Sequence, residues 1–75
     1  MLSFFATLVL EKLRSDPKWV APLHANNSFI DSLNELRESG YLRYGDYDRQ
    51  KIPPNSIINR DLIVILKNLE DTEDQ

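Results

Sequence analysis

The sequence predicts a small α+β domain that is mainly α-helical, with about three helices and one short β-hairpin around a single core. Apolar residues recur at helical spacing in three stretches, near the start, the middle and the end of the chain. A tyrosine-rich stretch before the last of them carries a glycine-aspartate turn, which is typical of short strands. Because 75 residues make about half of a common domain, we expect one domain over residues 1–69. The acidic tail EDTEDQ, residues 70–75, is expected to be disordered.

The composition is that of a folded, acidic protein. Hydrophobic residues make up 41% and charged residues 28% of the chain, and the formal net charge is -3. This balance argues against a generic nucleic-acid binder. The chain has no cysteine, which excludes disulfides, thiolate metal sites and cysteine nucleophiles. Since such a small core must hold by packing alone, we expect self-association or a partner to supplement it.

The apolar, uncharged stretch at residues 1–10 predicts a buried helix. It has half of the ~20 residues that a membrane span needs, and no basic residue precedes it as in a secretory signal. We therefore expect a cytoplasmic protein with no membrane partner. The helix is predicted over residues 2–14 and ends before Asp16-Pro17. Its buried face comprises Leu2, Phe5, Val9 and Leu13.

A second helix is predicted after an apolar connector at residues 19–23, in which Trp19 is expected to plug the core. Ser28 and Asp31 resemble a capping arrangement at the start of this helix. Gly40 closes it, because glycine adopts the left-handed conformation that ends many helices. The buried face is expected to comprise Phe29, Leu33 and Leu36, and the solvent face Asn34, Glu35, Arg37 and Glu38.

The remaining chain predicts a hairpin and a final element of two alternative kinds. The segment YLRYGDYDRQKI, residues 41–52, suggests two strands around Gly45-Asp46, although its polar second arm equally suits an extended loop. Over residues 58–69 the apolar stripe favours a third helix. The β-branched run inside residues 62–66 favours a buried strand instead, and the sequence leaves both open.

No arrangement of residues predicts catalysis, so we expect neither an enzyme nor a cofactor or metal site. His24 is the only histidine, and no carboxylates stand around it at a metal-binding spacing. No Gly-x-Ser-x-Gly elbow or phosphate-binding glycine loop is present. Asp46 and Asp48 lie in the predicted turn, where aspartate is favoured for its local hydrogen bonds.

Four residues around the predicted hairpin form the candidate partner-binding site. Tyrosine and arginine dominate binding hot spots, and here they alternate along one short segment. In a regular strand successive side chains point to opposite faces, so at least one tyrosine is expected in the core. A packing role and an interface role are equally consistent with the pattern. The candidate site residues are Arg43, Tyr44, Tyr47 and Arg49.

The segment LRESGYLRYGDYDRQKI resembles the recognition helix and wing of winged-helix domains. The resemblance implies DNA binding by a dimeric regulator. The residues that would face DNA are Asn34, Arg37, Arg43 and Arg49. However, residues 19–26 leave too little chain for the intervening helix of that family, and Asp31, Glu35 and Glu38 would repel phosphates.

Surplus apolar residues on the predicted helices decide the functional hypothesis. More of them lie outside the main stripes than a domain of this size easily covers, which favours a homodimer or a groove for another protein. We therefore expect a non-catalytic protein-protein interaction domain, acting as a small regulatory inhibitor, adaptor or subunit. The DNA-binding regulator is the second hypothesis. The surplus residues are Phe4, Leu8, Leu10, Ile63 and Val64.

Overall fold

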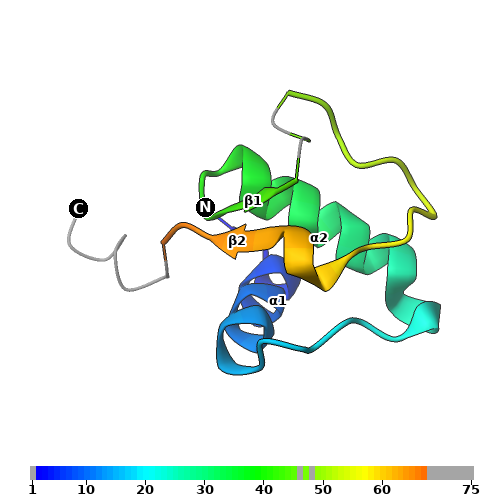
Figure 1. Cartoon of the computed structure of the whole chain (residues 1–75), viewed down its shortest axis with the longest axis horizontal. Coiled ribbons are helices and arrows are strands. Elements are labelled where there is room, and N and C mark those ends of the chain that lie inside the picture. The colour runs from blue at the N-terminus through cyan, green and yellow to red at the C-terminus, as the bar shows by residue number, and fades with distance from the viewer. Residues whose placement is uncertain (1, 46, 48, 68–75) are drawn as a thin grey trace.

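The computed structural model is a small α+β fold of two α-helices and a two-stranded antiparallel sheet (Figure 1). It describes residues 2–45, 47 and 49–67. The helices are α1 (Phe4–Ser15) and α2 (Asn26–Glu38), and the strands are β1 (Leu42–Tyr44) and β2 (Ile63–Ile65). Two short 3-10 turns, η1 (Leu23–Ala25) and η2 (Arg60–Leu62), precede α2 and β2. The tail at residues 70–75 lies outside the described residues, so its expected disorder stays a prediction.

The helix α1 confirms the predicted first helix, with a shift of its buried face. The side-chain oxygen of Ser3 caps its start by accepting a hydrogen bond from the Ala6 N–H. It ends at the residues before Pro17, as the sequence predicts. Leu10 was expected among the surplus residues, but it is fully buried, whereas Phe5 is partly exposed. The buried residues of α1 are Ala6, Val9, Leu10 and Leu13.

The helix α2 begins two residues before the predicted cap. Ala25 occupies the N-cap position and no side chain caps this end, so the predicted Ser28 and Asp31 arrangement is wrong. Its other end confirms the prediction. The N–H of Tyr41 donates to the Leu36 carbonyl at 2.9 Å and that of Gly40 to the Arg37 carbonyl at 3.1 Å, while Gly40 has a φ of 84°. These two bonds and the left-handed glycine form a Schellman motif.

The sheet corrects two expectations about the second half of the chain. β1 pairs antiparallel with β2 in the register Leu42↔Ile65, Arg43↔Val64 and Tyr44↔Ile63. The hairpin expected within residues 41–52 is therefore wrong, because the partner strand lies some twenty positions further along, as the register shows. The favoured third helix over 58–69 is also wrong where described. The alternative, a buried strand within 62–66, is confirmed as a strand over Ile63–Ile65, but Leu62, Val64 and Leu66 are exposed, so it is not buried on both faces. The β-branched run of β2 suits an extended backbone, and burial of Ile63 outweighs the helical stripe.

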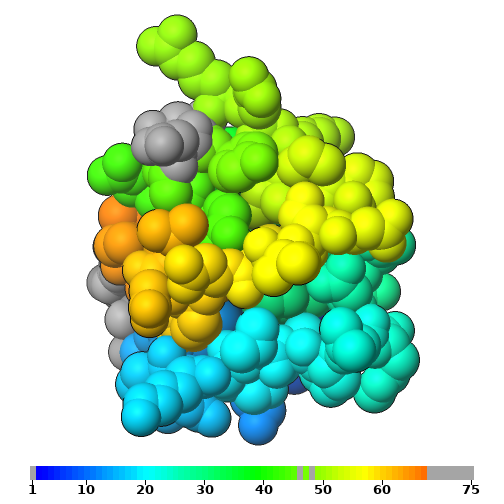
Figure 2. Space-filling view, turned by 45° about the vertical axis from the view of Figure 1, so that its right-hand side comes forward, coloured from blue at the N-terminus to red at the C-terminus, as the bar shows by residue number. Residues whose placement is uncertain are grey.

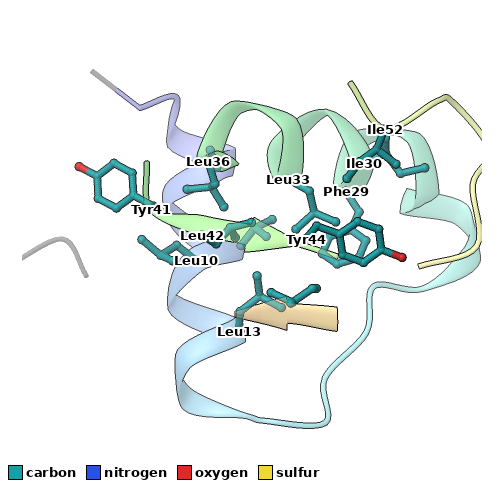
Figure 3. Packing of buried hydrophobic residues seen from close by; sticks show 13 residues of the cluster. Leu10, Leu13, Phe29, Ile30, Leu33, Leu36, Tyr41, Leu42, Tyr44 and Ile52 are labelled. Atoms are coloured by element: carbon teal, nitrogen blue, oxygen red, sulfur yellow. The ribbon is translucent and has the colours of Figure 1, made fainter. Parts of the chain in front are cut away.

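The core lies between the two helices and the inner face of the sheet. Figure 3 shows Leu42 of β1 at its centre, surrounded by leucines of α1 and α2. Phe29 and Ile30 of α2 and Ile52 of the connection between the strands close one end. Trp19 is half-buried, and its ring meets that of Phe29 edge-on, with centroids 5.4 Å apart at 84°. The expected role of Trp19 at the core is therefore confirmed in part.

The long connection between β1 and β2 is fastened to α2 by side chains. Asn34 is 8% exposed, and its carboxamide forms hydrogen bonds with both the N–H and the carbonyl of Ile52. Near the start of α2, the Asn27 side-chain oxygen accepts from the Asn55 N–H at 2.8 Å. Asn34 was expected to face solvent, which is wrong, because two backbone groups of the connection need a partner there. Glu38 is exposed as predicted, whereas Glu35 and Arg37 are half-buried.

Candidate docking surface

The four predicted partner-binding residues do not share one face. Tyr44 points inward from β1, is 5% exposed, and accepts a hydrogen bond from the Asn59 N–H on its hydroxyl at 3.0 Å. The ring of Tyr47 stacks on that of Tyr44, with centroids 5.8 Å apart at 28°. Arg43 lies on the opposite, outer face of the sheet, and Arg49 is exposed in the connection. The pair of tyrosines therefore packs against the core, while the two arginines remain accessible.

An apolar hollow of the described surface lies between α1 and the connector that follows it. It has a volume of about 600 Å³. We call this hollow the α1 groove. The half-buried Trp19 contributes its ring to the wall, and Phe29 of α2 to the floor beside it. Its apolar lining residues are Phe5, Leu8, Val9, Trp19, Ala21, Pro22, Ala25 and Phe29.

The polar side chains around the α1 groove give it a cationic edge. Lys12 and His24 line it together with Ser15 and Glu11. Glu11 forms an ion pair with Arg14, at 3.4 Å, so its charge is partly compensated. No hydrogen bond or ion pair to the Lys12 ammonium is found among the described residues. The groove is therefore an apolar surface with an uncompensated ammonium group at its edge.

A second, smaller hollow of about 230 Å³ continues from the α1 groove. Ala21 and Phe29 line both hollows, which makes the apolar surface continuous. Its outer wall includes Leu23 and Ile57, which are 93% and 95% exposed. Figure 2 shows this part of the surface, where the cyan connector and η1 lie below the yellow residues that precede β2. Side chains as large as these remain uncovered over two neighbouring segments.

The surplus apolar residues were predicted correctly in part. Phe4, Leu8 and Val64 are exposed, with Phe4 at 78%, whereas Leu10 and Ile63 are buried. The sequence indicated the exposed face of α1 but not the groove. The groove depends on the path of the connector, which Pro17 and Pro22 keep from continuing either helix. The two prolines were the only sequence signal for the groove. They predict that the chain bends in the connector, but they do not give the direction in which it then runs.

The surface of α2 does not match what the winged-helix resemblance implies. Asn34, which would face DNA, is buried against the connection. Two acidic residues, Asp31 and Glu38, stand among the exposed positions of the helix. Both would approach the phosphates of a duplex unfavourably.

The part of the chain that the structure describes contains no cluster of three or more histidine, cysteine or acidic residues able to hold a metal ion. It also contains no helix with the length and apolar character needed to cross a bilayer. Comparison of the chain with protein-family models, with curated proteins and with solved structures found no match. We therefore infer function from the α1 groove and the sheet.

Proposed function

We propose that this protein is a non-catalytic interaction domain that binds an apolar segment of another protein in the α1 groove. In this role it would act as a small inhibitor, adaptor or subunit of a regulatory complex, and we place it in the cytoplasm. The observation that carries the proposal is the apolar surface around the groove, where Phe5, Leu8 and Trp19 are left partly uncovered. Contiguous apolar surface of this kind marks interaction sites in soluble proteins.

The dimensions of the α1 groove suit a few side chains of a partner. Binding pockets commonly have volumes of about 300–1,000 Å³, and the groove, at about 600 Å³, lies inside that range. An amphipathic helix lays its anchoring side chains into such a groove at helical spacing. The aromatic rings that line the groove would pack favourably against an aromatic or leucine side chain of the partner.

The cationic edge of the α1 groove narrows the chemistry of the partner. The ammonium of Lys12 and the imidazole of His24 stand next to apolar lining. A carboxylate on the partner, close to its apolar anchors, would compensate the charge of the Lys12 ammonium and set the orientation of binding. We therefore expect an amphipathic segment that carries Asp or Glu beside its apolar anchors.

Selection from a random peptide library displayed on phage tests this proposal. The selected peptides should combine apolar anchors with neighbouring acidic residues, and NMR shift changes on binding should cluster at the α1 groove. Leu8→Ser should weaken the selected peptides at least tenfold, because it removes an apolar wall of the groove. Leu66→Ser is the matched control, since Leu66 is similarly exposed and does not line the groove. Shift changes centred on another face would reject the groove as the site.

The second candidate function is that of a dimeric DNA-binding regulator, and it predicts binding to duplex DNA instead of to a peptide. Arg43 on the outer face of the sheet and Arg49 in the connection are the exposed cations that favour it. A DNA-binding domain would be retained by duplex DNA and lose affinity steeply with added salt. We expect no such retention, because acidic residues share the exposed surface of α2.

A further inference from the structure

The outer edge of β2 leaves backbone groups without partners. The Leu66 N–H donates to the Tyr41 carbonyl at 2.8 Å, and the Gly45 N–H donates to the Leu62 carbonyl at 3.0 Å. In an antiparallel pair the bonded positions alternate, so the peptide groups of Ile63 and Ile65 point away from β1. The Ile63 N–H donates to the Arg60 carbonyl. Among the described residues, no hydrogen bond is found for the Ile63 carbonyl or for either backbone group of Ile65.

The part of the outer face that β2 contributes beside this edge is apolar, and Arg43 of β1 lies on the same face across from Val64. Leu62, Val64 and Leu66 occupy alternate positions, and their side chains are 44%, 53% and 52% exposed. The inward-facing residues at positions 63 and 65 are buried and half-buried. An unpaired strand edge next to exposed apolar side chains is a template for a further strand. A two-stranded sheet is also marginal by itself, which makes added strands stabilising.

We propose that a second copy of this chain pairs with β2 through its own β2, antiparallel across a two-fold axis, and forms a continuous four-stranded sheet. Ile65 lies opposite Ile65 of the second copy, and each N–H donates to the carbonyl of the other. In this register the Ile63 carbonyl faces the Lys67 N–H of the second copy, which within its own chain makes a longer bond of 3.3 Å to the Tyr41 carbonyl that it shares with the Leu66 N–H. Val64 of each copy then packs against Leu66 of the other, so that both exposed side chains become covered.

Charge distribution along β2 selects the antiparallel arrangement. Asp61 stands before the strand and Lys67 after it, and the Lys67 ammonium lies 4.7 Å from the centroid of the Tyr41 ring. The antiparallel pair places Lys67 of one copy at the end of the sheet where Asp61 of the other lies. A parallel pair would bring like charges together at both ends, which is unfavourable. The strand is therefore complementary in charge to an inverted copy of itself.

The pairing is independent of the proposed function. No residue of β2 lines the α1 groove, so each surface can be altered without changing the other. A dimer would present two such grooves, which raises avidity for a partner with two binding segments. Failure of the peptide selection would leave the pairing intact, and a monomeric protein would leave the groove proposal intact.

Sedimentation of the full chain over a range of concentrations tests the proposal. We expect a monomer-dimer equilibrium, and Val64→Lys should raise the dissociation constant at least tenfold. The exposed position of Val64 in the monomer leaves its fold intact, which circular dichroism would verify. The matched control is Leu8→Lys, a similarly exposed position on α1 that should leave the dissociation constant of the dimer unchanged. A monomer at every concentration, or a dimer sensitive to Leu8→Lys alone, would overturn the proposal.

Cysteine crosslinking tests the register, because the chain has no cysteine of its own. Residues 64 and 66 of opposite copies form a pair with Cα atoms about 4.5 Å apart in the proposed register, a separation that allows a disulfide. A mixture of Val64→Cys and Leu66→Cys chains should therefore oxidise mainly to the mixed dimer. Each variant alone should crosslink at least fivefold more slowly. Equal rates for mixed and unmixed samples would contradict the register.

Discussion

Asn34 pairs with Ile52 as the backbone of a neighbouring strand would. The side-chain oxygen of Asn34 accepts from the Ile52 N–H at 2.8 Å, and its amide nitrogen donates to the Ile52 carbonyl at 3.1 Å. Arg37, one turn further along α2, donates to the same side-chain oxygen at 3.3 Å. One buried carboxamide thereby satisfies both backbone polar groups of Ile52. This residue lies in the long connection, where no neighbouring strand supplies hydrogen-bond partners.

Replacing Asn34 by leucine should destabilise the protein more than any exposed substitution on α2. Leucine has the same number of side-chain heavy atoms as asparagine but forms no hydrogen bond, so two buried backbone groups of Ile52 lose their partner, which costs about 2–4 kcal/mol. Urea denaturation followed by circular dichroism measures the change. The control is Asn27→Ala, because its hydrogen bond to Asn55 is exposed and can be replaced by water. Equal losses for the two variants would show that burial of the Asn34 contact has no special importance.

Local signals account for the parts of the fold that the sequence predicts. The two helices follow from apolar spacing, and the end of α2 follows from Gly40, because each depends on residues within a few turns. The partner of β1 depends on a segment some twenty residues away, and nothing in residues 42–44 identifies it. Burial of Asn34 has the same origin, since the covering residue arrives from the connection.

The candidate site was predictable by residue type but not by orientation. Tyrosines and arginines at residues 43–49 are binding residues in general, yet the pairing with β2 fixes which of them point inward. Tyr44 falls on the inner face and Arg43 on the outer face as a direct result of the register. The α1 groove depends on the path of the connector. The prolines keep the connector from being helical, but they do not determine that path.

Gly40 should tolerate no L-residue without loss of stability. Its φ of 84° lies in the left-handed region, and a Cβ added there would meet no atom within 4 Å. The cost of Gly40→Ala is therefore purely a backbone cost, about 1–2 kcal/mol. Thermal denaturation should show a lower Tm for this variant. Gly40→Asn should lose less, because asparagine enters this conformation more readily; an alanine variant as stable as the parent would contradict the argument.

The start of α1 should show energetic coupling between Ser3 and Glu35. The Ser3 hydroxyl donates to the Glu35 carboxylate at 2.8 Å and accepts from the Ala6 N–H at 3.1 Å, and the Ser3 N–H also donates to that carboxylate. Ser3→Ala should cost about 1 kcal/mol as a lost cap. In a double-mutant cycle with Glu35→Ala the two losses should be less than additive, since the variants remove a shared contact. Strict additivity would show that the contact contributes nothing in solution.

Trp19 and Phe29 should be coupled through their rings. Trp19 is the single tryptophan of the chain, and its ring forms a T-shaped pair with that of the fully buried Phe29, with centroids 5.4 Å apart. Because an edge-to-face pair contributes about 0.5–1.5 kcal/mol beyond apolar burial, Trp19→Leu and Phe29→Leu should each lower stability, and their double-mutant cycle should show coupling of that size. Circular dichroism in urea supplies all four free energies of unfolding without depending on tryptophan emission.

A control cycle pairs Phe29→Leu with Val64→Ala on the outer face of the sheet, where no coupling is expected. Coupling as large in the control as between the rings would assign the effect to general softening of the core instead of to the aromatic contact.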